Sequence, residues 1–391
     1  MVEFEEDNIK NNDFVERNSN RRCTVNMGEN AYNDILRKHS KDLIIQDGKV
    51  FVDLLLNVHN SAINLSLIPF CALYCRSAKE FLCIENTGNE IEKEVKDIRD
   101  GLKIFTDKYT KGKKMVSKMD NQQNEVFKNK LRFPLTKILN IHLNLGVSFN
   151  EQARVVFNTQ LANFYLNIIQ NKEDSDGEHA RVVGEKLGSE IAEILVKYCG
   201  IDDLKEKGTH LNAVPKYGYI DFNTNRNNDF FSKEFDKETN LIILHMLSTI
   251  GFVNNLLVPV FQDKNIWLLR IIYITAHNTW LGIKRINQHF EQNHSIRIKN
   301  LNFTDDDLNL FSTSFRNCMM HYDLVDKSEC HVILQEWYDP QKPLYGLVES
   351  CFSGLNFNQY YEKIYNLSQK LEEYLLSYFK VNQNDIHWDW D

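Results

Sequence analysis

Residues 357–380, FNQYYEKIYNLSQKLEEYLLSYFK, carry a nearly unbroken apolar stripe. Its apolar side chains recur every three or four residues, at Tyr360, Ile364, Leu367, Leu371, Leu375 and Phe379. Because an α-helix completes a turn in about 3.6 residues, this spacing places them on one helical face. The segment therefore predicts a long amphipathic helix that packs by that face against other elements.

Three further segments before it show helical periodicity: 237–259, 263–291 and 305–323. The first is apolar on most sides, so we expect it to be central, and Pro259 suits its end. The third follows Thr304, a predicted N-cap, and opens with three aspartates that suit the positive end of a helix dipole. Four helices in about 150 residues predict a bundle over residues 235–391.

The N-terminal part also shows mostly helical patterns, in segments 53–86, 90–109, 121–140, 150–171 and 178–199. The segment Ala153–Ile169 has the clearest apolar face, and Gly200 is placed to stop the last helix. Ile44–Val52, centred on Asp47-Gly48, instead predicts a short β-hairpin.

Changes in composition divide the chain. Residues 1–25 are rich in Asn and charge, which predicts a disordered tail, and 26–200 form a mostly helical domain of unknown function. Residues 201–234 are polar, with two glycines and a proline, and predict a linker or long loop before the bundle at 235–391.

The overall composition agrees with a mainly α fold. In 391 residues there are only 16 Gly and 6 Pro, too few for the many special turns of barrels and sandwiches. The net charge of −8 argues against a protein that coats nucleic acid without selectivity, although a local basic track remains compatible with it.

Nothing in the sequence predicts a membrane protein. The N-terminus lacks the pattern of a signal peptide, and the apolar stretch Val50–Cys75 is interrupted by Asp, Asn and His residues. The eight cysteines form no CxxC pair, which argues against a metal site of that type, and we expect a cytoplasmic, reduced protein that needs no cofactor or metal.

A polar cluster stands on the helix predicted at 305–323. Asn317 and His321 are four residues apart, so their side chains lie one above the other on one face. Arg316 projects about 100° away, but its side chain is long enough to curl toward that face. The helix thus offers a fixed cation, an amide and a group that titrates near neutral pH.

This grouping suits phosphodiester chemistry. A histidine can transfer protons, and a guanidinium can hold a phosphate by paired hydrogen bonds and stabilise developing charge. With RNA the 2′-OH is an internal nucleophile, so no metal is needed and a 2′,3′-cyclic phosphate is left. One histidine cannot easily serve both reacting oxygens, whereas a two-fold dimer would present two.

Arg316-Asn317-Cys318-Met319-Met320-His321 resembles the R-N-x-x-x-H motif of the HEPN superfamily, and the following Tyr322-Asp323 is in keeping with many members. The resemblance covers about residues 235–382 and implies a helical bundle whose active site forms from Arg and His at a dimer interface. It implies a metal-independent ribonuclease of a microbial defence, toxin or abortive-infection system. It explains nothing of the first 230 residues.

Charge near the motif is uneven. Residues 301–350 contain nine acidic and three basic side chains, a poor surface for RNA, whereas 264–299 carry a net charge of +5. Within that stretch Lys284, Arg285 and His289 are candidates for RNA-backbone contacts, although an ordinary charged helix end is an equal alternative. His277 could lie near the motif, but the pattern favours a hydrogen-bonded core histidine.

Two hypotheses follow from the sequence. In the first, the chain is a cytoplasmic homodimeric endoribonuclease, in which His321 is the acid/base group, Arg316 the phosphate clamp and Asn317 the orienter. A regulatory protein partner is compatible with the unexplained N-terminal region. In the second, the bundle is a catalytically inactive scaffold that binds RNA or a protein partner.

Overall fold

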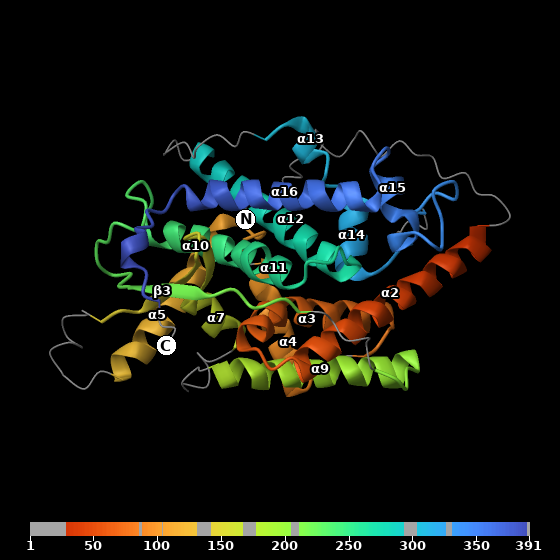
Figure 1. The fold of residues 1–391 in the computed structure, drawn as a ribbon, viewed down its shortest axis with the longest axis horizontal. Coiled ribbons are helices and arrows are strands. Elements are labelled where there is room, and N and C mark those ends of the chain that lie inside the picture. Colours follow the sequence, from red (N-terminus) through yellow and green to blue (C-terminus); the bar gives the residue numbers. More distant parts are fainter. Residues whose placement is uncertain are drawn as a thin grey trace, which may run out of the picture.

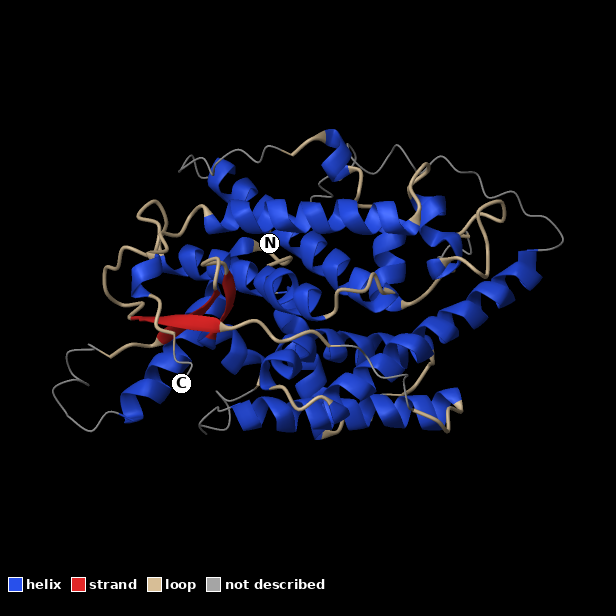
Figure 2. Cartoon of the chain, in the orientation of Figure 1, coloured by secondary structure: helices blue, strands red, loops and turns tan. Residues whose placement is uncertain are grey.

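The computed structural model describes eight stretches of the chain: 29–85, 88–103, 105–130, 142–166, 177–204, 211–292, 303–325 and 331–388. The predicted tail, residues 1–25, lies outside them. Within these stretches the protein is mainly helical, as predicted, with one sheet of three strands. Figure 2 shows the sheet at one side of the helices.

The first half contributes a layer of long helices, α2 (Glu29–Asn57), α3 (Ser61–Phe81), α4 (Glu90–Lys103) and α9 (Gly177–Cys199). Helix α9 packs along α2 and α3, as Figure 1 shows at the lower edge of the molecule. Close packing is possible there because Gly184 and Gly188 lie directly against side chains of α2 and α3. Gly200 has a φ of 72° and ends α9, which confirms the predicted stop.

A small antiparallel sheet joins this layer to the second half. Its strands are β1 (Leu145–Asn150), β2 (Val155–Asn158) and β3 (Tyr217–Phe222), in the order β2-β1-β3. Helices α5 (Tyr109–Lys130) and α7 (Thr159–Tyr165) lie beside it. At the outer edge of β3, the backbones of Tyr219 and His387 exchange two hydrogen bonds of 2.9 Å.

The second half is built on three long helical segments. Helix α10 (Lys237–Gly251) continues through a π-helical stretch, η1 (Phe252–Leu257), into α11 (Val258–Val260). Helices α12 (Ile266–Gln292) and α16 (Phe357–Leu376) contact α10 and each other. Short helices complete this half: α13 (Asp305–Leu308), α14 (Thr313–His321), η2 (Pro343–Gly346), α15 (Leu347–Cys351) and η3 (Gln383–Asp385).

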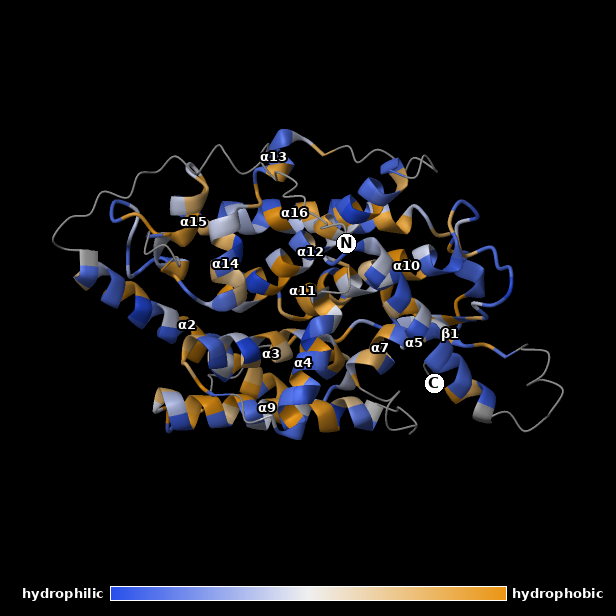
Figure 3. Ribbon diagram, turned by 180° about the vertical axis from the view of Figure 1, so that it is seen from behind, coloured by the Kyte–Doolittle hydropathy of each residue, from blue (hydrophilic) through white to orange (hydrophobic). Residues whose placement is uncertain are grey.

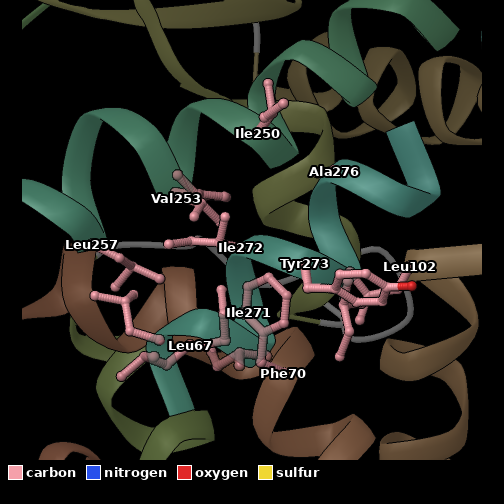
Figure 4. Packing of buried hydrophobic residues seen from close by; sticks show 14 of the residues in the cluster. Leu67, Phe70, Leu102, Ile250, Val253, Leu257, Ile271, Ile272, Tyr273 and Ala276 are labelled. Atoms are coloured by element: carbon pink, nitrogen blue, oxygen red, sulfur yellow. The ribbon is translucent and has the colours of Figure 1, made fainter. Parts of the chain in front are cut away.

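Buried apolar side chains of both halves form one core. In Figure 4, Leu67 and Phe70 of α3 pack near Leu257 of η1 and Ile271 of α12. Figure 3 shows apolar residues on the central α10 and α11, whereas the outer end of α2 is mainly polar. The division into separate domains at 26–200 and 235–391 stays a prediction, and part of the linker predicted at 201–234 forms β3.

The predicted hairpin at Ile44–Val52 is wrong, because these residues lie inside α2. Two distant contacts explain why an Asp-Gly pair occurs in a helix. Asp47 is buried and accepts hydrogen bonds from other elements, and a side chain at Gly48 would overlap Tyr74 of α3. Helix packing therefore overrides the turn tendency of these two residues.

The single helix predicted over 150–171 is also wrong. Val155 and Val156 lie in β2 and are both fully buried, so a run of apolar residues fits a covered strand as well as a helix. The chain turns helical only at α7, where the Asn158 side chain accepts a hydrogen bond from the Leu161 amide at 3.0 Å.

The helix predicted over 305–323 is two helices, α13 and α14. Thr304 caps α13 as predicted, in a reciprocal capping box with Asp307. Asp307 also binds Lys370 of α16, and Ser312 caps the separate start of α14. A second cap eight residues after the first divides the apolar pattern between two helices.

The segment Lys237–Val260 is long and apolar enough to cross a membrane. Within the structure, however, 94% of its most apolar window is buried against protein. This is the burial of a core helix of a soluble protein, and it confirms the central place predicted for 237–259.

Candidate functional site

Helix α14 carries the three residues of the predicted site and has well-defined ends. It begins after Ser312, whose side chain accepts a hydrogen bond from the Phe315 amide at 3.4 Å. It ends at His321 because Tyr322 adopts a left-handed conformation, with φ at 62°, while its amide still reaches the Cys318 carbonyl at 3.0 Å. His321 is therefore the last residue of the helix.

Arg316 and Asn317 lie together, as their spacing predicts. The Arg316 Nη1 atom donates a hydrogen bond to Asn317 Oδ1 at 2.9 Å, so the guanidinium does curl toward the Asn317 face. Both side chains are partly buried. The amide thus restricts the freedom of the cation, which reduces the entropy lost when the cation binds a ligand.

His321 lies outside the core. Its side chain is 44% exposed, and its Nδ1 atom is 3.7 Å from Oε2 of Glu80 on α3. Arg316 and His321 are five residues apart, which separates them by roughly 7.5 Å along the helix axis and about 140° around it. The two side chains therefore leave the helix in different directions, and the length of the Arg316 side chain brings its guanidinium back toward the face that Asn317 shares with His321.

A second histidine, His277 of α12, lies near Arg316. Its ring packs against Tyr273 and Phe311, with ring centres 5.8 and 5.4 Å away. Burial, followed by the positive charge of Arg316, lowers the pKa of His277 to about 4. This imidazole is therefore neutral at pH 7, and its aromatic packing agrees with the core role that the sequence favours.

A buried charged network fixes the C-terminal end of α14. Arg270 of α12 donates from Nε to Asp47 Oδ2 at 2.7 Å, and from Nη1 to the carbonyls of Cys318 and Met319 at 3.1 and 2.8 Å. Tyr322 donates its hydroxyl to the same Asp47 oxygen at 2.8 Å, and its ring lies 3.9 Å below the guanidinium. The last carbonyls of α14 thus receive a cation.

Sequence reasoning missed this network. Asp47 shares its helical face with apolar residues three and four positions away, Leu43, Ile44, Val50 and Phe51, and Arg270 stands in an otherwise apolar run of α12. A lone acid and a lone base in two such apolar settings are a signal for a buried pair, because buried charges need partners. The pair itself, 223 residues apart in the chain, carries no local pattern.

The weaker RNA-binding candidates lie elsewhere on α12. Lys284 and Arg285 are exposed, whereas the His289 ring stacks on Tyr109 of α5 at 4.2 Å. Lys284 follows His277 by two helical turns, about 10 Å along the axis, on nearly the same face. The structure therefore separates these residues from the motif and gives His289 a packing contact.

Among the described residues, no group of three or more His, Cys, Asp or Glu side chains is arranged to hold a metal ion. Comparison with protein-family models, curated proteins and solved structures gives no match for this chain. The likeness to HEPN proteins therefore rests on the motif and its helical setting.

Proposed function

We propose that this chain is a metal-independent endoribonuclease with a HEPN-like site, in which His321 transfers protons, Arg316 binds the phosphate and Asn317 orients Arg316. The observation that carries the proposal is the exposure of His321 at the fixed end of α14. A histidine that served only the core would lie inside it, whereas this one reaches solvent on the helix that also carries the Arg316–Asn317 pair.

The reaction follows from these groups. An imidazole removes the proton of a ribose 2′-OH, the 2′-oxygen attacks the adjacent phosphorus, and the bond to the 5′-oxygen breaks. The leaving 5′-oxygen takes a proton from an imidazolium. The products are a 2′,3′-cyclic phosphate and a 5′-OH. Arg316 donates to the non-bridging oxygens, whose negative charge grows in the transition state.

The proposal includes a homodimer. The attacking and leaving oxygens lie on opposite sides of the phosphorus, so two imidazoles serve them better than one. A two-fold axis beside α14 would bring His321 of a second copy to face Arg316 of the first. In each copy, the bundle of the HEPN type would consist of α10, α12, α14 and α16.

The charge distribution favours a selective nuclease. Of the basic candidates, Lys284 and Arg285 remain exposed and can contact an RNA backbone, while the region around the motif is acidic. RNA would therefore bind locally. A role in antiviral defence, abortive infection or toxin-like growth arrest follows only from the family resemblance.

The test uses purified protein, total RNA and excess chelator. The wild type should cleave RNA and leave 2′,3′-cyclic phosphate ends, and His321→Ala should lower the rate by about 10²–10⁴. Arg316→Ala should also lower it strongly. His59→Ala, at an exposed histidine before α3, is the matched control and should cleave normally.

The alternative is a catalytically inactive scaffold, and the same experiment separates the two. Equal cleavage by His321→Ala and wild type would contradict the proposed nuclease site. A monomeric solution mass for a cleaving enzyme would contradict the homodimer. RNA binding without any cleavage, unchanged by both motif substitutions, would favour the scaffold.

A further inference from the structure

Helix α3, which belongs to the N-terminal half, touches the end of α14. Ser77 of α3 is buried and donates its hydroxyl to the Met320 carbonyl at 2.6 Å. Met320 immediately precedes His321, so this bond fixes the backbone from which the imidazole extends. The acidic neighbour of His321 stands on the same helix, one turn beyond Ser77.

That neighbour is Glu80. Residues three apart on a helix share a face, so Ser77 and Glu80 point to the same side of α3. When Ser77 holds the Met320 carbonyl, Glu80 is brought opposite His321, and its Oε2 atom lies 3.7 Å from Nδ1. Both side chains are about half exposed, which leaves space for substrate.

The end of α3 is itself firmly held. Lys79, beside Glu80, forms ion pairs of 3.0 Å with Glu92 of α4 and 2.6 Å with Glu190 of α9. All three of these side chains are largely buried, so the pairs are less screened than surface pairs. Two neighbouring helices thus fix the position from which Glu80 approaches the imidazole.

We infer that Glu80 is a positioning residue for His321, holding the proton of the neutral imidazole on Nδ1 and leaving Nε2 to receive the proton of the substrate. At 3.7 Å the two atoms are outside direct hydrogen-bond distance. A carboxylate beside one ring nitrogen nevertheless favours, by charge attraction, the tautomer that carries its proton on that nitrogen. The inference rests on the proposed nuclease function. It gives the N-terminal half a direct part in a site that the motif alone would assign to the bundle.

The inference also accounts for the exposure of the pair. An exposed ion pair contributes little to stability, so Glu80 has little value as a structural contact. A carboxylate that orients a histidine needs no such contribution. Its effect appears in the tautomer and the rate.

The test measures the tautomer directly, in the full-length protein with ¹⁵N-labelled histidine. Long-range ¹H–¹⁵N spectra distinguish Nδ1–H from Nε2–H, and the spectrum of His321→Ala identifies the His321 signals. We expect the Nδ1–H form in the wild type and a shift toward Nε2–H in Glu80→Gln. Glu85→Gln, at an exposed glutamate four residues after the end of α3, should leave the signals unchanged.

Cleavage supplies the second measurement. Glu80→Gln should lower kcat roughly tenfold with little change in KM, and Glu80→Asp should restore part of it. An unchanged His321 tautomer in Glu80→Gln, in an enzyme that still requires His321, would overturn this inference alone. A wild-type protein that cleaves no RNA would instead overturn the proposed function, whatever the tautomer.

Discussion

The two ends of α14 are held by different kinds of interaction. At the N-terminal end, Phe315 packs in a cluster of aromatic rings, within 5.1 Å of Tyr273, Phe352 and Tyr360. At the C-terminal end, Arg270 and Asp47 supply buried charge. Aromatic packing tolerates small displacements, whereas a buried ion pair offsets the cost of its desolvation only when its geometry is good. The end that carries His321 is therefore the end that is fixed more exactly.

The largest effect is expected at the charged end. Arg270→Met removes one partner of a buried pair and leaves the Asp47 carboxylate without its cation, so the free energy of unfolding should fall by about 3–5 kcal/mol. Urea denaturation measures it. The double variant Asp47→Leu/Arg270→Met removes both charges, so its free energy of unfolding should fall by less than that of the single variant. A larger fall in the double variant would refute the contrast between the two ends of α14.

A smaller effect is expected at the aromatic end. Phe315 is fully buried, and Phe315→Leu keeps most of its apolar volume while removing its ring contacts. The free energy of unfolding should fall by about 2 kcal/mol. The same urea titration applies. A loss as large as that of Arg270→Met would show that the two ends do not differ in this respect.

The smallest effect is a pH dependence at the aromatic end. The pKa of His277 is lowered to about 4 by burial and by Arg316, below the usual value near 6.5. Between these values the unfolded chain binds a proton that the folded chain does not, so stability falls as pH falls from 6.5 toward 4. When the pH is lowered from 7.5 to 5.5, the free energy of unfolding of the wild type should fall by about 1.3 kcal/mol more than that of His277→Phe.

Urea titrations of both proteins at the two pH values measure this difference. His245, buried in α10 with a pKa lowered to about 3, titrates in both proteins, so its contribution cancels. Equal losses in both proteins would mean that His277 is not held neutral beside Arg316.

The sequence predicts the parts of the fold in which the local pattern and the tertiary setting agree. The stripe from Tyr360 to Leu375 lies in α16, and the Thr304 cap forms where expected. The predictions failed where distant partners decide the conformation. Asp47-Gly48 is helical because of contacts with α12 and α3, and Val155 is in a strand because β1 pairs with it.

The candidate site divides in the same way. The contact between Arg316 and Asn317 follows from their spacing on one helix, so it could be predicted. Ser77 and Glu80 could not, because each is more than 240 residues from its partner on α14 and neither stands in a motif. Residue types in a motif indicate which chemistry it can perform, whereas tertiary packing determines which other side chains lie beside the motif.

The apolar helix Lys237–Val260 also has a consequence for synthesis of the chain. Its partner α16 ends at Leu376, which is 116 residues after Val260, the end of the apolar segment. At about 5–20 residues per second, the ribosome needs roughly 6–23 seconds to complete that partner. During this interval the nascent chain carries an apolar segment, similar in length and composition to a membrane span, that cannot yet pack against α16. Chaperone binding is therefore most needed before α16 emerges.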